Sequence, residues 1–388
     1  MKQQKLEQLI LLSLSLVLIT AYSVSATLPQ MMAFYQGYDE SAVNLLISIP
    51  SFGVMLMVLL NLFFSRYLKE RPCIITGLAL FTVAATVPTY CSAYPVVLIS
   101  RLLLGIGSGL VNAKAISVIS LRYQGEERAR LLGYRGSVES FGSALLALIA
   151  GFLLKGGWQK AYFVYFIGLP VLLAYVLFFR GRGTTDASPA ADQAPRAKWE
   201  RPALMAAIRL AMLGFLIIST YTVISMRLAG LFENRGYGTA TEASIFISVM
   251  TCVSIVAGMG YGFVKKKLGD MLRILALLAG IAGLTLLFFS HSLVLSCIAV
   301  VLFAFTYTFI NIGVFEGVAE AVPPAFIDRA TSLVLTGCNL GAFLATYLIS
   351  LAGLVSADVG ASLLLMAVLM LVAAVILLIR RFLARRQA

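Results

Sequence analysis

The chain has 388 residues, of which 60% are hydrophobic and 12% charged, and its formal net charge is +13. About a quarter of the residues of an ordinary soluble domain are charged, so this composition excludes a soluble globular protein of the same length. It favours a chain that lies mostly in a lipid bilayer.

Apolar segments long enough to cross a bilayer recur along the chain, since a spanning helix needs about 20 mainly apolar residues. In the first half we expect spans near residues 8–33, 41–64, 73–90, 95–121, 130–154 and 160–179. In the second half we expect them near 206–232, 242–264, 271–290, 293–319, 330–355 and 359–379. The first segment is too long, and too polar at its far end, for a cleaved signal peptide. The sequence therefore predicts an all-α integral membrane protein with twelve transmembrane helices.

A polar stretch separates the two sets of spans. Residues 180–202 are rich in Pro, Ala, Gly and charge and show no helical pattern, which is typical of a flexible linker. The predicted organisation is an N-terminal six-helix bundle (1–180), a cytoplasmic linker (181–203) and a C-terminal six-helix bundle (204–388).

Basic residues gather in the loops of one side. The loops of the other side contain only Lys155, Lys160 and Arg235. Because cytoplasmic loops carry the excess of Lys and Arg, both termini and the linker are expected in the cytoplasm, and the protein in the cell (inner) membrane. This distribution explains the net charge without a nucleic-acid partner.

The two halves resemble each other. The triplet ERA at 127–129 and the triplet DRA at 328–330 lie 201 residues apart, and so do Gly136 and Gly337. A basic loop also follows the second span of each half. These landmarks indicate a duplicated six-span unit, a plan that recurs in transporters whose halves are related by an axis along the membrane normal.

The fourth span carries the most specific motif, VxxxRxxLGxGSG at residues 97–109, which resembles the fourth-span signature of drug/proton antiporters in the major facilitator superfamily. The likeness covers essentially the whole chain. The segment GYRGSVESFGS (133–143) is similar to the glycine-rich antiporter motif of the fifth span, without its proline. The loop after the second span is similar to a conserved superfamily loop through Arg66 and Lys69, and its second-half copy through Gly262 and Gly269.

This resemblance implies two pseudo-symmetric six-helix bundles around a central cavity, lined by the first and fourth spans of each half. One bundle would rock against the other, with the loop residues Arg66, Lys69, Gly262 and Gly269 acting in the conformational switch. The resemblance also implies a coupling role for Arg101 and a monomeric protein.

Polar residues follow one face of the first span. Ser13, Thr20, Ser23, Thr27 and Gln30 fall close together on a helix at about 100° per residue. The corresponding face of the seventh span carries Ser219 and Thr222. Such a stripe should face helices or water rather than lipid, so it either lines the cavity or makes interhelical hydrogen bonds. The predicted substrate-cavity residues are Thr20, Ser23, Thr27, Gln30, Asn112, Ser219, Thr222 and Asn311.

Several charges lie inside predicted spans, where each costs at least ~2.5 kcal/mol and calls for a partner or an aqueous pocket. Arg135 and Glu139 are four apart and can pair along one helix face, either as a structural contact or as a proton site. Lys114 and Glu316 occupy nearly equivalent positions of the two halves and are a candidate pair across the cavity. The predicted proton-coupling and gating residues are Arg101, Lys114, Arg135, Glu139 and Glu316.

The glycines at 105, 107 and 109 permit either bending of the fourth span or close helix packing, and we favour packing.

These features predict a secondary active transporter, proton-coupled because no GxxxxGK[ST] phosphate loop is present for ATP. The first span lacks the acidic residue of many drug/proton antiporters, and the buried cations favour export of small amphipathic or anionic molecules. The alternatives are a multidrug/proton antiporter for lipophilic cations, a lipid or glycolipid flippase, and a non-transporting receptor. An integral membrane enzyme is disfavoured because the single histidine, His291, lies in a short loop, and no HExxH or GxSxG motif occurs. The expected partners are a small-molecule substrate, protons and membrane lipids; no cofactor or metal is expected.

Overall fold

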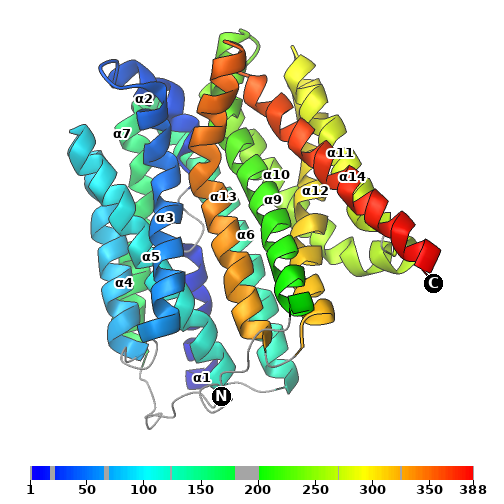
Figure 1. Cartoon of the computed structure of the whole chain (residues 1–388). Helices are drawn as coiled ribbons and strands as arrows, with labels where there is room; N and C mark the ends of the chain where they lie inside the picture. Colours follow the sequence, from blue (N-terminus) through cyan, green and yellow to red (C-terminus); the bar gives the residue numbers. More distant parts are fainter. Residues whose placement is uncertain are drawn as a thin grey trace. The chain divides into compact units, whose positions relative to one another are not determined.

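The computed structural model describes residues 2–17, 22–64, 70–122, 125–179, 201–269, 271–323 and 326–387. In this part of the chain every regular element is a helix (Figure 1). The prediction of an all-α membrane fold is therefore confirmed. The predicted linker (181–203), apart from its last three residues, lies outside the described residues.

The first half contains long helices separated by short turns. They are α3 (Glu40–Phe64), α4 (Glu70–Thr86), α5 (Tyr94–Arg122) and α6 (Gly125–Leu153). The sixth predicted span is built from α7 (Trp158–Ala161), the 3-10 helix η6 (Tyr162–Ile167) and α8 (Gly168–Phe178).

The first predicted span is less regular than the others. Its described parts are α1 (Lys2–Ser13), the 3-10 helices η1 (Leu14–Val17) and η3 (Ser25–Thr27), and α2 (Leu28–Phe34). Residues 18–21 lie outside the description.

The second half consists of six long helices. They are α9 (Arg201–Asn234), α10 (Ala240–Leu268), α11 (Met271–Phe289), α12 (Leu293–Ala321), α13 (Ile327–Val355) and α14 (Ala361–Gln387). Over the described ranges, eleven helical segments are long and apolar enough to cross a membrane. This count agrees closely with the twelve predicted, and the difference is the first span.

Local signals set the ends of α10 and α12. Thr239 begins α10 with a capping box, in which its hydroxyl accepts from the Glu242 amide and the Glu242 carboxylate accepts from the Thr239 amide. Gly269 ends the helix with a φ of +51°, a conformation that favours glycine. The hydroxyl of Ser292 accepts from the Leu295 amide at the start of α12.

The glycines of the fourth-span motif bring helices into close contact. A Cβ atom at Gly107 would lie 2.7 Å from the carbonyl oxygen of Gly77 on α4, and one at Gly109 would lie 2.6 Å from the Cβ of Met57 on α3. Only glycine permits these approaches, so the packing interpretation of the motif is confirmed.

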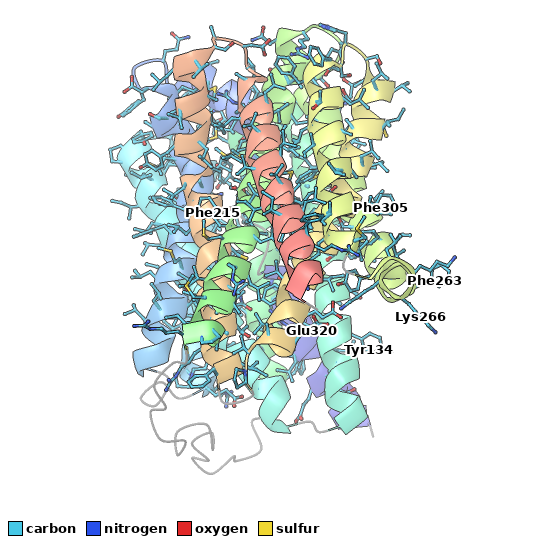
Figure 2. The ribbon with its side chains drawn as sticks, turned by 45° about the vertical axis from the view of Figure 1, so that its right-hand side comes forward. Tyr134, Phe215, Phe263, Lys266, Phe305 and Glu320 are labelled. Atoms are coloured by element: carbon cyan, nitrogen blue, oxygen red, sulfur yellow. The ribbon has the colours of Figure 1, made fainter. Side chains whose placement is uncertain are left out.

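Apolar side chains also cover the outside of the helices. Met259 on α10 is 84% exposed and Val355 at the end of α13 is 88% exposed. Phe263 and Lys266 project outward near the end of α10 (Figure 2). Exposed apolar surface of this extent is expected where helices face acyl chains.

The structure divides into two compact units. Unit 1 comprises residues 1–24 and 45–200, and unit 2 comprises residues 25–44 and 201–388. Helix α3 begins in unit 2 and continues in unit 1. Within unit 1, α4 packs mainly against α5; within unit 2, α13 packs mainly against α9, and α11 against α12. Gly337 of α13 allows the close contact between α13 and α9, because a Cβ there would lie 2.6 Å from the carbonyl oxygen of Ala211 on α9.

Candidate functional site

Arg101, on α5 in unit 1, is completely buried. Its Nε donates to the carbonyl oxygen of Leu46 on α3 at 2.9 Å, and its Nη1 donates to the hydroxyl of Tyr165 on η6 at 3.0 Å. The guanidinium carbon is 5.5 Å from the ring centroids of both Tyr162 and Tyr165, within the range of cation–π attraction. Neutral oxygens and aromatic faces therefore contribute to stabilising this cation in its apolar surroundings.

A second polar group joins α5 and α6 in unit 1. Arg135 of α6 donates from Nη2 to Oδ1 of Asn112 on α5 at 2.6 Å. The same Nη2 lies 3.8 Å from Oε2 of Glu139, the ion pair that the four-residue spacing predicts. The Arg135 and Glu139 side chains are 13% and 17% exposed. We call Asn112, Arg135 and Glu139 the α5–α6 polar cluster.

Lys114 is buried on α5, two residues beyond Asn112. It belongs to unit 1, whereas Glu316 belongs to unit 2. The pairing of these two residues stays a prediction.

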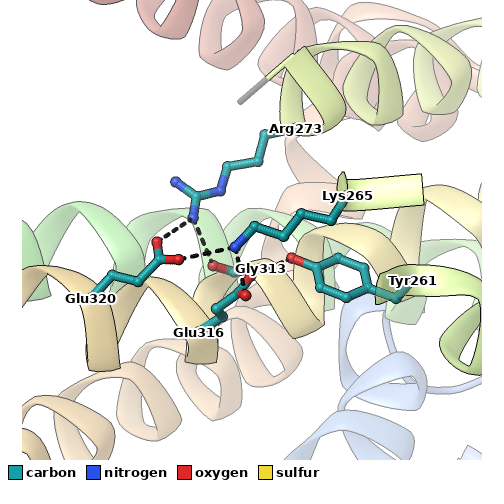
Figure 3. Close-up of polar contacts among 6 residues, drawn as sticks. All are labelled: Tyr261, Lys265, Arg273, Gly313, Glu316 and Glu320. Atoms are coloured by element: carbon teal, nitrogen blue, oxygen red, sulfur yellow. Dashed lines mark hydrogen bonds and ion pairs between the residues drawn. The ribbon is translucent and has the colours of Figure 1, made fainter. Parts of the chain in front are cut away.

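Glu316 forms part of an ionic cluster within unit 2 (Figure 3). Lys265 of α10 places its Nζ 2.5 Å from Oε1 of Glu316 and 2.9 Å from Oε1 of Glu320, both on α12. Tyr261 donates its hydroxyl to Oε2 of Glu316 at 2.6 Å. Arg273 of α11 lies 3.8 Å from Glu320. We call these five residues the α10–α12 ionic cluster.

Two glycines shape this cluster. Arg273 donates from Nη2 to the carbonyl oxygen of Gly313 at 3.2 Å. A Cβ at Gly313 would lie 3.5 Å from Arg273 Nε, and one at Gly317 would lie 3.4 Å from Arg273 Nη2. The guanidinium therefore lies next to the backbone of α12, and a Cβ at either glycine would touch it at ordinary van der Waals distance.

Two further arginines of unit 2 have carboxylate partners. Arg227 of α9 pairs with Glu40 at the start of α3, with 2.5 Å between Nη1 and Oε1. Arg235, at the end of α9, pairs with Asp358 at 3.5 Å and donates to the carbonyl oxygen of Ser290 at 2.9 Å. These cations bridge segments that are distant in the sequence.

The predicted cavity residues make mainly local contacts. Ser219 and Thr222 donate to the carbonyl oxygens of Leu216 and Ile218, one turn earlier on α9. Thr27 donates to the sulfur of Met31 at 3.2 Å. The residues of this set that lie in the described ranges are buried (Ser23, Thr27, Ser219, Thr222) or half-buried (Gln30, Asn112, Asn311), whereas Thr20 lies outside those ranges. Their role in substrate binding stays a prediction.

Only two of the four predicted switch-loop residues lie in the described ranges. Arg66 and Lys69 lie outside the described ranges. Gly269 has the positive φ noted above, whereas Gly262 is inside α10, where an added Cβ would meet no atom within 4 Å. The backbone conformation therefore favours glycine at position 269, whereas the described surroundings do not require it at position 262.

The model of the Major Facilitator Superfamily matches residues 10–346. The chain belongs to this superfamily. Its members are membrane transporters and not enzymes, and this superfamily protein is a multi-pass membrane protein.

The curated relatives of this superfamily chain include two resistance proteins. It is 28% identical over 213 residues to the methylenomycin A resistance protein of Bacillus subtilis, a match that covers 48% of this chain and 44% of the relative. It is 26% identical over 222 residues to the multidrug resistance protein MdtL of Escherichia coli, covering 55% of this chain and 56% of the relative. The match thus spans about half the length of each relative.

Solved superfamily structures share the fold over nearly the full length. A POT family transporter in complex with a thioalcohol-conjugated peptide has a TM-score of 0.79 at 16% identity, and covers 97% of this chain and 96% of its own. A D-xylose–proton symporter has a TM-score of 0.75 at 16% identity, with 95% and 96% covered. At this identity the likeness concerns the fold alone.

Proposed function

We propose that this superfamily member is a proton-coupled secondary transporter that exports small amphipathic or anionic organic molecules by alternating access. We infer the substrate class from the charges of the described side chains on α5 and α6. Arg101, Lys114 and Arg135 are buried or nearly so, and Glu139 is the one carboxylate described at comparable depth on these helices. A positive excess in a low-dielectric region attracts an anion more strongly than the same charge would in water.

The relatives support export. Both are named for resistance, and removing a toxic compound from the cell is a direct way to confer it. The proposed arrangement has both termini and the linker in the cytoplasm, with six-helix bundles at 1–180 and 204–388, and a monomer as the working unit. Membrane lipids would surround both bundles.

Proton coupling rests on the carboxylates that have cationic partners inside the membrane helices. Glu139 pairs with Arg135, and Glu316 pairs with Lys265. Protonation of either carboxylate would remove its attraction for the cation, so proton uptake can change contacts between or along helices. Arg101 would hold α3, α5 and η6 together while these contacts change.

The second candidate is a multidrug/proton antiporter for lipophilic cations, which the name of the MdtL relative favours. The two candidates differ in the sign of substrate charge. Purified protein in sealed proteoliposomes under an imposed pH gradient would be tested with dansylglycine, an amphipathic carboxylate, and with ethidium, a lipophilic cation.

We expect gradient-dependent movement of dansylglycine that a protonophore abolishes. Movement of ethidium without dansylglycine would favour the second candidate instead. Movement of either probe that is unaffected by the protonophore would overturn proton coupling.

A further inference from the structure

The α5–α6 polar cluster joins the apolar segments of two long helices. Asn112 lies in the segment Tyr94–Asn112 of α5, and Arg135 and Glu139 lie in the segment Tyr134–Gly156 of α6, both apolar enough to lie in a membrane. The helices themselves extend over Tyr94–Arg122 and Gly125–Leu153. The cluster therefore places charged and amide groups within membrane-spanning parts of both helices.

The hydrogen bonding of Arg135 is incomplete. A guanidinium has five N–H donors, and among the described residues only Nη2 has an acceptor, the amide oxygen of Asn112. The Nε atom is buried and has no hydrogen-bond partner there. Buried polar atoms are nearly always hydrogen-bonded, so an unsatisfied arginine Nε calls for an explanation.

Glu139 does not supply the missing acceptor. Its Oε2 is 3.8 Å from Nη2, which is ion-pair distance but too long for a hydrogen bond. A pair that served only to hold α6 together would be expected to close this gap, because a charge-assisted hydrogen bond is shorter, about 2.7–2.9 Å. The carboxylate therefore balances the charge of Arg135 without occupying its donors.

We propose that Arg135 is the receptor for the carboxylate of an amphipathic organic anion, with Glu139 as the internal counter-ion that the ligand replaces. This inference rests on the proposed function for the identity of the ligand as the transported molecule. The planar fork of arginine matches a carboxylate with two parallel hydrogen bonds, and the free Nε belongs to that fork. Asn112 holds the guanidinium through one hydrogen of Nη2.

The surroundings define the rest of the ligand. The segments Tyr94–Asn112 and Tyr134–Gly156 are predominantly apolar, so a ligand that extends from Arg135 along them meets mostly apolar side chains. A small carboxylate with an apolar body fits this arrangement better than a strongly hydrated ion such as sulfate. The same donors could also take the phosphate of an anionic lipid, and the experiment below separates the two sources.

The test measures equilibrium binding to the purified full chain in phosphatidylcholine nanodiscs. The probes are dansylglycine and dansylglycinamide, which differ only in the carboxylate. We expect the acid to bind more tightly than the amide. Arg135→Gln should weaken binding of the acid at least about tenfold, since a hydrogen bond to a charged group contributes about 1.5–3 kcal/mol, and should leave the amide unchanged.

Glu139→Gln should tighten acid binding, because it removes the competing negative charge and keeps the side-chain size. A gain in affinity cannot come from misfolding, so this variant remains decisive if Arg135→Gln folds poorly. Arg209→Gln is the matched control: Arg209 is an exposed residue of α9 in unit 2 and donates to the carbonyl oxygen of Met205, whereas the cluster belongs to unit 1, so its loss should not change binding.

Equal affinity for acid and amide, or acid binding that is unchanged in both Arg135→Gln and Glu139→Gln, would overturn the proposal. Nanodiscs that contain phosphatidylglycerol distinguish the lipid. Loss of dansylglycine binding in these discs would assign the site to a lipid headgroup and overturn the small-molecule assignment. No gradient is present, so a failure of proton coupling would leave this binding intact, and transport of dansylglycine that is insensitive to Arg135→Gln would refute the site alone.

Discussion

Lys265 and Glu316 join α10 to α12 through an ion pair of 2.5 Å, and Tyr261, one turn before Lys265, donates to the second oxygen of the same carboxylate. Each oxygen of Glu316 thus has a partner that favours the ionised form. Lys265 also contacts Glu320, so a single ammonium is shared between two carboxylates one turn apart. Loss of the charge on Glu316 would leave Lys265 held by Glu320 alone.

We expect Glu316→Gln to abolish proton-driven transport, because glutamine can neither take up a proton nor pair with Lys265. Substrate flux and proton flux in proteoliposomes under an imposed pH gradient check this. Glu320→Gln is the control: its side chain is 55% exposed, and we expect coupled transport to persist. Undiminished coupling in Glu316→Gln would remove this residue from the mechanism.

Arg101→Lys should lower the free energy of unfolding of the protein in detergent by about 2 kcal/mol. A lysine at this buried position cannot donate simultaneously to Leu46 and Tyr165 with the geometry of a guanidinium, so at least one buried acceptor loses its hydrogen bond. Tyr165→Phe removes one of these bonds and should cost about 1 kcal/mol. Equal stability of Arg101→Lys and the wild type would show that the two bonds do not matter.

Gly107→Ala should destabilise the packing of α4 against α5. The new Cβ would meet backbone 2.7 Å away, and overpacking of a tight core costs about 1–3 kcal/mol. Gly260→Ala on α10 is the matched control, because no atom lies within 4 Å of its Cβ position. Thermal unfolding of both variants in the same detergent is the measurement, and a lower midpoint for Gly260→Ala than for Gly107→Ala contradicts the argument.

The two glycines near the end of α10 should respond oppositely to alanine. Gly269→Ala forces a side chain into a positive-φ conformation, which costs on the order of 1–3 kcal/mol. Gly262→Ala places a better helix former in open space and should stabilise by up to about 1 kcal/mol. Denaturant unfolding of the pair checks the sign, and a stabilising Gly269→Ala would be inconsistent with the observed turn.

The ion pair of Arg227 with Glu40 should contribute little to stability despite its short distance. The Glu40 side chain is 52% exposed, and solvated pairs typically contribute about 0.2–1 kcal/mol. A double-mutant cycle with Arg227→Gln and Glu40→Gln should return a coupling energy in this range that falls as salt is added. A larger coupling that salt does not change would mean that water does not reach the pair.

The long helices could be predicted from the sequence because hydrophobic length is a local property. The predicted span 293–319 begins at the same residue as the observed helix α12, Leu293–Ala321, and ends two residues before it. The first span was harder to predict in detail. Its apolar content indicates a membrane segment, but composition does not reveal that Leu14–Val17 and Ser25–Thr27 form 3-10 turns.

The partners of the charged residues could be predicted only where they are local. The Arg135–Glu139 pair follows from four-residue spacing on one helix. The partners of Glu316 are Tyr261 and Lys265 on another helix, and sequence spacing gives no signal for contacts of that kind. The sequence contains one signal for the aromatic partners of Arg101, the two tyrosines in the run YFVYFI at 162–167. Their spacing of three residues places them near each other on a 3-10 helix.

The guanidinium of Arg273 lies beside α12, where its Nη2 donates to the carbonyl oxygen of Gly313 and a Cβ at Gly313 would touch its Nε at van der Waals distance. Alanine therefore fits at position 313, but a longer side chain would displace the guanidinium. At position 317 even a Cβ would lie 2.9 Å from the side chain of Leu210. Homologues that keep the arginine are thus expected to keep a small residue at position 313, whereas homologues that have lost it are free to carry a larger one there.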